Sequence, residues 1–407
     1  MASLRQLRNS LTVTWVTVLL ALAIVASPAA QAQTFSVIHN FTGGGDGALP
    51  EAGVTVRGGI LYGTTFGGGN GHGAVYAITH SGSDWVTLPI SILSTGGTYP
   101  VARVVFGPDG HPYGTTQLGG SHNAGLVFDL IPPLTICKTA SCYWKENILY
   151  EFQGGDNGAE PLFGDLVWDP QGNIYGTTSA GGFDGYGTVY ELQPSGNSWV
   201  QTIIHRFLGP DGISPDNGVV FGPNGGLYGT TEGSLGGAGT VFELTYIPGV
   251  GWQHKLLYEF TTNDAGGLPR AGVIFDNSGN LYGATSDAGA EGGGTVFELM
   301  PSGNSYTFKL LYSFSGDPSC GPFGTLTMDA AGALYGTTHC EGANHFGSVF
   351  KLTGTGNGWV YTSLHDFSGS DGQYPTSKVT IDADGTLYGT ASRGGSQNMG
   401  VVWMIKP

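Results

Sequence analysis

NLYGATSDAGAEGGGTVFEL, residues 280–299, is the clearest copy of a unit that recurs along this chain. Its Tyr-Gly-(Thr/Ala)-(Thr/Ala) string occurs seven times, at spacings between 51 and 62 residues. The tyrosines of these strings are Tyr62, Tyr113, Tyr175, Tyr228, Tyr282, Tyr335 and Tyr388. A regular recurrence of this length is typical of propellers and solenoids.

Each repeat contains four short strand-like runs, which we name A, B, C and D in chain order. In the fourth repeat they cover residues 217–222, 226–231, 239–244 and 252–260, and turn residues separate them. The 73 glycines mark these turns, and a chain that is 40% hydrophobic can bury a core, which argues against disorder. The pattern predicts four-stranded antiparallel blades.

The two ends of the chain complement each other. Six repeats have a run D, whereas the last repeat ends at its run C, residues 401–406. A seventh copy of the second half of run D lies near the N-terminus, at residues 35–41. We therefore predict an all-β, seven-bladed β-propeller in which residues 35–41 form the outer strand of the last blade and close the ring. An open solenoid of hairpins is the alternative.

The consensus Gly-Asn-Leu-Tyr-Gly-Thr-Thr, followed by a glycine-rich loop and Gly-Thr-Val-Phe-Glu-Leu, closely resembles the GloVer tandem repeat. That repeat occurs in exported bacterial proteins described as choice-of-anchor proteins. The matching residues include 173–192, 280–299 and 334–352, and the resemblance covers residues 35–407. It implies a secreted or surface propeller-like protein and implies no particular reaction.

The first 32 residues have the layout of a secretory signal peptide: Arg5 and Arg8, an apolar run at 11–26 and a small-residue cleavage site at 30–32. A retained membrane anchor is the alternative. Residues 33–407 are then a single domain with 12 basic and 30 acidic residues, a net charge of −18. We expect a secreted, periplasmic or cell-surface monomer that binds no nucleic acid and does not insert into a membrane once the signal is removed.

The B–C and D–A loops of such blades open on one face, and loops on a rigid scaffold commonly carry function. Aspartates recur in the D–A loops, and Asp beside Gly is typical of turns, so we interpret them as turn formers, with calcium binding as the alternative. They are Asp46, Asp156, Asp211, Asp264 and Asp371. The repeated tyrosines, and the tryptophans that open run D, are interpreted as packing between blades. His39, His205 and His365 exchange with tyrosine at one position of run D, which indicates a packing site with a polar tip and not a metal ligand or a catalytic base.

Polar residues that do not recur are better candidates for a binding face, because a single site needs residues that the fold does not repeat. They are Glu160, Asp184, Glu232, Arg270, His339, Glu341 and Arg393. His72, His122 and His345 fall at similar places in B–C loops and are weak candidates for a metal site. No catalytic motif and no cofactor motif is present, so we assign no catalytic residue, cofactor or metal.

Four cysteines in an exported chain suggest disulfide bonds. We predict the pairs Cys137–Cys142, within the one long insertion, and Cys320–Cys340, between two loops of one face.

Two functions remain open. The first is a non-catalytic binding module for a polysaccharide or a protein outside the cell. The second is a glycan hydrolase or lyase with its site on the loop face. The fold alone does not choose between them.

Overall fold

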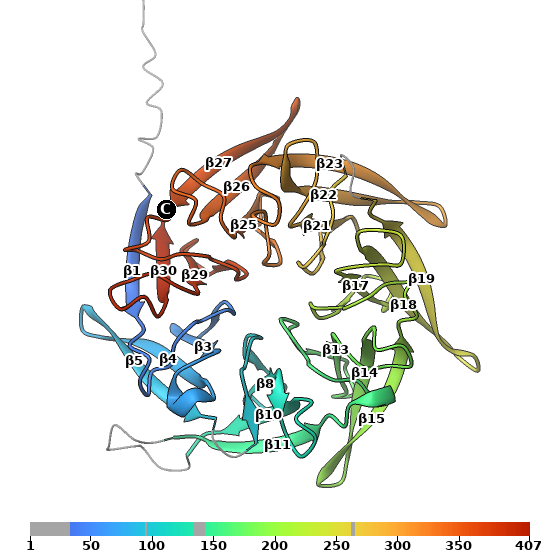
Figure 1. Ribbon diagram of the computed structural model, residues 1–407, viewed down its shortest axis with the longest axis horizontal. Helices are drawn as coiled ribbons and strands as arrows, with labels where there is room; N and C mark the ends of the chain where they lie inside the picture. Colours follow the sequence, from blue (N-terminus) through green and yellow to red (C-terminus); the bar gives the residue numbers. More distant parts are fainter. Residues whose placement is uncertain (1–32, 94–95, 134–142, 262–264) are drawn as a thin grey trace, which may run out of the picture. The chain divides into compact units, whose positions relative to one another are not determined.

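The computed structural model describes residues 33–407 except 94–95, 134–142 and 262–264. Residues 33–407 form one compact unit. It contains seven four-stranded antiparallel sheets, arranged as blades around a ring (Figure 1). The predicted seven-bladed propeller is confirmed, whereas the predicted signal peptide, residues 1–32, lies outside the described residues.

Each blade contributes one strand to each of four concentric layers. The innermost strands A are β2 (Thr55–Arg57), β7 (Val105–Phe106), β12 (Val167–Trp168), β16 (Val220–Phe221), β20 (Ile274–Phe275), β24 (Thr327–Met328) and β28 (Thr380–Ile381). Strands B are β3 (Ile60–Thr65), β8 (Pro112–Thr116), β13 (Ile174–Thr178), β17 (Leu227–Thr231), β21 (Leu281–Thr285), β25 (Leu334–Thr338) and β29 (Leu387–Ala391). Strands A are mostly two residues long, shorter than the runs predicted from the sequence.

The two outer layers are longer. Strands C are β4 (Ala74–Ser81), β10 (Leu126–Ile131), β14 (Thr188–Ser195), β18 (Thr240–Ile247), β22 (Gly292–Ser302), β26 (Ser348–Thr355) and β30 (Val401–Lys406). Strands D are β5 (Asp84–Ile92), β11 (Lys145–Glu151), β15 (Ser198–Arg206), β19 (Gly251–Glu259), β23 (Ser305–Ser315), β27 (Gly358–Asp366) and β1 (Thr34–Asn40). The loops add a small two-stranded sheet, β6 (Gly97–Thr98) with β9 (Leu118–Gly119), and two 3-10 turns, η1 (Gly69–Gly71) and η2 (Gly155–Asn157).

The N-terminal strand closes the ring as predicted. The last blade has the order β1-β30-β29-β28, with Thr34 opposite Lys406 and Asn40 opposite Val401. Strand C of this blade therefore has a hydrogen-bonded neighbour on both sides, and the edge that would otherwise be open is paired. Figure 1 shows β1 (blue) lying beside β30 (red), although they come from opposite ends of the described chain.

Each letter of the Tyr-Gly-Thr-Thr string has a structural reason, which the fourth repeat illustrates. The Tyr228 ring packs edge-on against Phe275 of the next blade, at 4.9 Å between ring centroids. A Cβ atom on Gly229 would lie 2.7 Å from the Phe242 ring, so only glycine fits there. The Thr230 hydroxyl donates to the Ala271 carbonyl of the next blade at 2.8 Å. The tyrosine and the first threonine of the string thus tie blade 4 to blade 5.

Aromatic rings also fill the space between blades near the rim. Tyr62 contacts Phe106 of the next blade at 5.0 Å and Trp144, which precedes β11, at 6.4 Å. Tyr175 makes the same two contacts with Phe221 and Trp252, at 5.4 and 6.1 Å. The predicted packing role of the repeated tyrosines and tryptophans is confirmed, and these rings supply much of the buried apolar area that holds the ring together.

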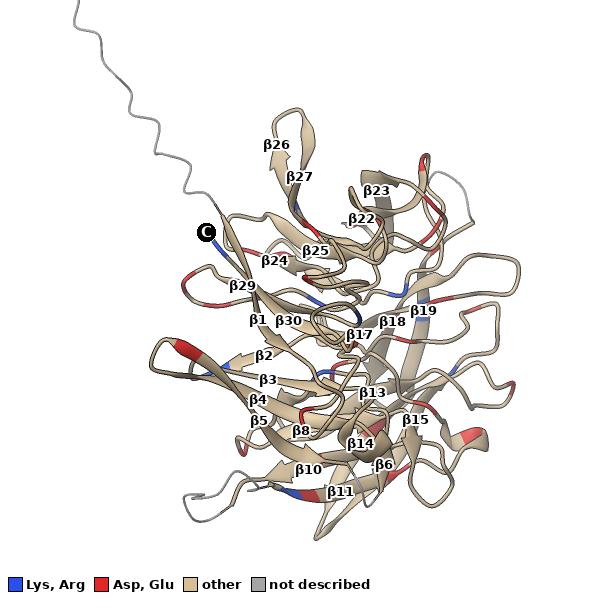
Figure 2. Ribbon diagram, turned by 60° about the vertical axis from the view of Figure 1, so that its left-hand side comes forward, with Lys and Arg blue, Asp and Glu red and all other residues tan. Residues whose placement is uncertain are grey.

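Acidic residues outnumber basic residues in this chain. Figure 2 shows a small number of Lys and Arg positions (blue) among more numerous Asp and Glu positions (red), many of them on turns and loops. Among the described residues, no helix is long and apolar enough to cross a lipid bilayer.

Candidate functional site at the central cavity

The B–C and D–A loops of each blade lie together on one face, as the sequence predicts. The first residue after strand B donates its backbone N–H to the residue before the repeat proline: Phe66 to Leu49 at 3.0 Å and Glu232 to Ser214 at 2.9 Å. The pre-proline residue donates in turn to the preceding blade, as Leu49 does to Met399 at 2.8 Å. These bonds fix the loop face around the mouth of the ring.

A cavity of about 500 Å³, counting the part open to solvent, lies at this end of the innermost strands. A buried apolar residue begins each strand-A segment, and these are Val54, Val104, Leu166, Val219, Val273, Leu326 and Val379. Every residue lining the cavity occupies one of the three positions before that residue. They are Glu51, Ala52, Gly53, Val101, Arg103, Phe163, Asp165, Asn217, Arg270, Phe323, Gly324, Thr325, Thr376, Ser377 and Lys378. The repeat keeps its apolar anchor and varies the residues that face the cavity.

An ion pair links several blades on one side of the cavity. The Arg103 guanidinium and the Asp165 carboxylate make two hydrogen bonds, one from Nε to Oδ1 at 3.1 Å and a second from Nη2 to Oδ2. Arg103 Nη1 also donates to the Val54 carbonyl and the Thr380 hydroxyl, both at 3.4 Å. One side chain thereby connects blades 1, 2, 3 and 7. Its exposed fraction is 14%.

A second cation, Lys378, lies beside this pair. Burial, and then the positive charge of Arg103, lower the pKa of Lys378 to about 8, although Asp165 opposes the shift. Burial alone would raise the pKa of Asp165, but Arg103 and Lys378 outweigh it and hold that pKa below its usual value. At neutral pH this side of the cavity therefore holds two cations and one carboxylate.

A row of side chains from four consecutive blades leads away from the cavity, and Arg270 and Phe323 are its members that line the cavity. Glu232 Oε1 is 2.6 Å from Nη2 of Arg270, and the Arg270 guanidinium lies 4.7 Å from the centre of the Phe323 ring. His339 packs between Phe323, at 4.7 Å, and Tyr374, at 4.8 Å. Arg270 Nε and His339 Nδ1 are buried without a hydrogen-bond partner among the described residues. Burial, and then the charge of Arg270, lower the pKa of His339 to about 4, so its ring is neutral at pH 7.

Asp216 lies next to Glu232, and the two carboxyl groups share a hydrogen bond. Its exposed fraction is 9%. Burial, and then the charge of Glu232 together with a hydrogen bond between the two carboxyl groups, raise the pKa of Asp216 well above its usual range, although Arg270 opposes the shift. Two carboxyl groups in contact keep one proton between them, because both cannot ionise cheaply at short range.

The structure brings three of the predicted face residues together, Glu232, Arg270 and His339, and disperses the others. Glu160 accepts a hydrogen bond from Gln117 at 3.3 Å. Arg393 lies close enough to Glu51 to oppose the rise that burial causes in the pKa of Glu51. Asp184 is exposed, and Glu341 is half-buried near Asp317, outside the cavity lining.

The three histidines considered for a metal site are all exposed. His72, His122 and His345 belong to neither of the two groups of possible metal ligands found among the described residues.

The repeated aspartates of the D–A loops behave as turn residues. Asp46, Asp211 and Asp371 accept backbone N–H groups within their own loops, from Thr42, Leu208 and Ser368 at 2.9, 2.7 and 2.8 Å. Asp156 lies in η2, and Asp264 lies outside the described residues. The interpretation as turn formers therefore holds for the three aspartates with these bonds, and calcium binding stays untested.

A disulfide bond joins Cys320 and Cys340, the predicted pair between a D–A loop and the B–C loop of the same blade. Cys137 and Cys142 lie outside the described residues, so that predicted pair stays a prediction.

Sequence reasoning missed Arg103, Asp165, Lys378 and Asp216. Aligning the seven repeats with one another would nevertheless have identified the positions that these residues occupy. Counted back from the anchor, the third residue before it is Glu, Val, Phe, Asp, Arg, Phe and Thr in the seven blades, and the residue immediately before it is Gly, Arg, Asp, Gly, Gly, Thr and Lys, so both positions vary within a conserved frame. A residue's position in the repeat therefore predicts whether it lies at the cavity better than its being a polar loop residue does.

The fold and this cavity define a closed seven-bladed propeller with a mixed-charge chamber at one end of its axis. The chain belongs to the Gloeobacter/Verrucomicrobia repeat family, whose model matches residues 24–234 and 232–407. No curated protein matches the sequence.

Solved structures with the same fold have little sequence in common with this chain. The Pseudomonas aeruginosa periplasmic gluconolactonase is 17% identical with a TM-score of 0.51, over 85% of this chain and 95% of that one. A polysaccharide lyase described as an ulvan lyase is 12% identical with a TM-score of 0.52, over 88% and 93% of the two chains. A structure of that lyase bound to GlcA(1-4)Rha3S has a TM-score of 0.51 at 13% identity, over the same shares of the two chains. These likenesses show the fold alone.

Proposed function

We propose that this protein is an exported, non-catalytic propeller that binds an anionic saccharide unit of an extracellular polysaccharide in the central cavity. One observation carries the proposal: three of the 12 basic residues outside residues 1–32 line this cavity, in a chain whose charge is otherwise strongly acidic. Arg103, Arg270 and Lys378 outnumber the lining carboxylates, Glu51 and Asp165.

The chemistry of the lining fits such a ligand. A guanidinium matches the planar geometry of a carboxylate or a sulfate, and an ammonium supplies a point charge. Phe163 and Phe323 add apolar surface on which the face of a sugar ring can pack. A protein partner would need a larger apolar patch than this cavity provides, so a saccharide is the better candidate.

Isothermal titration calorimetry tests the proposal with uronic-acid, sulfated and neutral oligosaccharides of equal length. We expect binding of an acidic oligosaccharide, no measurable binding of the neutral one, and at least about tenfold weaker binding for Lys378→Gln, since a charge-assisted contact contributes roughly 1.5–3 kcal/mol. Lys309→Gln is the matched control, because it removes the same charge from strand β23, where Lys309 pairs with Glu298 at 3.2 Å. Equal affinity for acidic and neutral ligands, or equal losses in both variants, would contradict the proposal.

The pH dependence gives an independent check. A bound anion stabilises the protonated form of Lys378, whose pKa is about 8 in the free protein. Above that pH the lysine must take up a proton on binding, so affinity should fall as the pH rises from 7 to 9. In Lys378→Gln this decline should disappear.

A specific observation supports catalysis as a second candidate. A protonated carboxyl group, Asp216, and a neutral imidazole, His339, both lie beside Arg270. These are a proton donor and a proton acceptor next to a group that can neutralise a carboxylate. The contact between Asp216 and Glu232 is closer than the separation of about 5 Å or more that two-carboxylate hydrolysis uses, which favours elimination by a lyase over hydrolysis.

An activity screen on uronic-acid polysaccharides separates the two candidates. A lyase would release products with the ultraviolet absorbance of an unsaturated sugar, and Asp216→Asn and His339→Gln would each abolish that signal. A protein that binds the polysaccharide without releasing such products, at every pH from 5 to 9, would exclude the second candidate and leave the first.

A further inference from the structure

Three blades share a pairing between strand D and the loop that follows it. Nε2 of a histidine lies 3.2 Å from Oδ2 of an aspartate in His39–Asp46, 2.9 Å in His205–Asp211 and 3.0 Å in His365–Asp371. The pair holds the D–A loop against the outer strand. Its recurrence shows that it belongs to the fold and does not by itself mark a site.

A ring from the neighbouring blade covers the histidine of two of these pairs. Phe35 stacks on His365, with 3.5 Å between ring centroids and 5° between planes. His254 stacks on His205, at 4.5 Å and 13°. In the next two blades the position of His254 is taken by Phe308 and Tyr361, which stack on Tyr258 and Tyr312. Among the described residues, only blade 4 places a second histidine over a His–Asp pair.

His254 brings a group that the packing does not satisfy. Its Nε2 is buried and has no hydrogen-bond partner. A buried polar nitrogen without a partner destabilises the fold unless something binds it.

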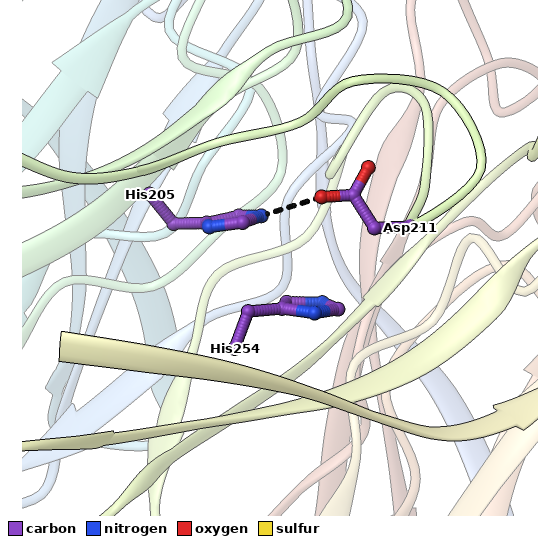
Figure 3. Close-up of side chains that lie close together, drawn as sticks. All are labelled: His205, Asp211 and His254. Carbon is purple, nitrogen blue, oxygen red and sulfur yellow. Dashed lines mark hydrogen bonds and ion pairs between the residues drawn. The ribbon is translucent and has the colours of Figure 1, made fainter.

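The geometry suits a metal ion. One ligand atom each from His205, Asp211 and His254 lies within 4.8 Å of the other two. Figure 3 shows the two imidazole rings lying parallel, with the Asp211 carboxylate near the nitrogen-bearing ends of both rings. Zinc takes imidazole and carboxylate ligands at about 2.0–2.2 Å. An imidazole binds a metal in its ring plane and the two rings are stacked within 13° of parallel, so the His254 ring must rotate out of the stack before both rings reach one ion and fill, with Asp211, three of four tetrahedral positions.

We propose that His205, Asp211 and His254 form a binding site for a divalent transition metal of the zinc class, with water as the fourth ligand. The ion lies between His205 Nε2 and the carboxylate, and Nε2 of His254 supplies the third ligand atom. His205 binds it as the neutral Nδ1–H tautomer, so a proton held on Nε2 moves to Nδ1 through solvent. Two imidazoles and one carboxylate favour zinc, cobalt or nickel over calcium, which prefers oxygen ligands only. The site would join β15, the loop after it and β19, and so fasten blade 3 to blade 4.

The second group of possible ligands is explained by turn chemistry. Asp109 accepts hydrogen bonds from the His111 backbone at 3.0 Å and from the Tyr113 hydroxyl at 2.9 Å. Asp129 accepts from Asn147 at 2.6 Å and bonds His111 Nδ1 at 2.9 Å. Asp169 and Asp276 make the same turn contacts in other blades. Among the described residues, this second group has no buried nitrogen or oxygen that lacks a partner as His254 Nε2 does, so we assign no ion there.

Titration of the purified, metal-free full chain with Zn²⁺ tests the site, with Co²⁺ as a spectroscopic probe. We expect one equivalent of saturable zinc binding, visible d–d absorption with cobalt that indicates imidazole ligation, and a Tm that rises with zinc concentration. His254→Phe should lose at least about tenfold in affinity, since even an outer-shell change has effects of that size. Phenylalanine is the residue of the next blade at this position, so the variant keeps the stacking and should fold.

Two matched controls keep the test specific. His365→Tyr removes the histidine of a pair that lacks a third ligand, and tyrosine occupies that position in other blades. His111→Asn disrupts the second group of ligands, and the equivalent residues Asn173 and Asn280 show that asparagine is accepted there. Both variants should bind zinc as the wild type does. The proposal is overturned if the wild type shows no saturable zinc binding, if His254→Phe binds zinc unchanged, or if His111→Asn abolishes binding.

Discussion

Closure of the ring by β1 can be tested through one side chain, Phe41, which follows that strand. Phe41 is fully buried, and its ring lies 5.1 Å from that of Tyr76 in an edge-on contact. It belongs to a cluster that includes Leu61 of blade 1 and Val402 of blade 7, so it lies at the seam between the first and last blades. Truncation to alanine leaves a cavity there, and Phe41→Ala should cost about 3–5 kcal/mol of unfolding free energy. Urea unfolding followed by tryptophan fluorescence measures this change.

Two variants calibrate the expected loss. Phe367 is the equivalent residue of blade 6 and is also fully buried, so Phe367→Ala should cost as much as Phe41→Ala. Phe183 is 67% exposed and lies 5.0 Å from the Arg206 guanidinium, so Phe183→Ala should cost about 1 kcal/mol or less. A loss for Phe41→Ala no larger than that for Phe183→Ala would refute the view that the seam is as firmly packed as the other blade contacts.

Further predictions concern packing, the carboxyl pair and the disulfide. Gly336→Ala should destabilise the fold by about 1–3 kcal/mol, because the new Cβ would lie 2.6 Å from the Phe350 ring. Gly356 has no atom within 4 Å of the equivalent Cβ position, so the stability of Gly356→Ala should be within about 0.5 kcal/mol of wild type in the same urea assay. Because the pKa of Asp216 is raised in the folded state, the folded chain holds a proton that the unfolded chain has released above about pH 4. Stability should therefore decline as the pH rises from about 4 through neutrality. Asp216→Asn should flatten this decline, which is measured as Tm against pH. Replacing both Cys320 and Cys340 by serine should cost about 3 kcal/mol, since the bond closes a loop of 20 residues, and an unchanged Tm on reduction of the wild type would contradict this.

Much of the fold could be read from the sequence because the constraints on it are local and recur. The ring of a strand-C aromatic residue leaves room only for glycine after each strand-B tyrosine, as Gly229 and Phe242 show. Glycine therefore occupies this position in every repeat. The threonine that follows recurs in six of the seven repeats, with Ala284 in the fifth, and its bond to the next blade is one reason. The unequal ends of the chain predicted the closing strand, because an unpaired edge of a sheet needs a partner.

The candidate site was less accessible to such reasoning. Glu232, Arg270 and His339 were singled out because they do not recur, but Asp184 and Glu341 met the same criterion and lie elsewhere. Arg103 and Lys378 are 275 residues apart in the sequence, and only the closure of the ring places them side by side. The lowered pKa of Lys378 depends on burial in that shared space and on the charge of Arg103.

The sequence by itself determined the period, the number of blades, the strand order and the way the ring closes, because each of these follows from contacts within one repeat or between one repeat and the next. The tertiary structure alone decided which of the variable residues meet. Seven copies of one position converge on the axis, so residues from distant blades share a cavity, and a histidine of blade 4 stacks on a His–Asp pair of blade 3. Burial and proximity raise the pKa of Asp216 and leave Nε2 of His254 without a hydrogen-bond partner, and both arise from distances in space that no spacing along the chain encodes.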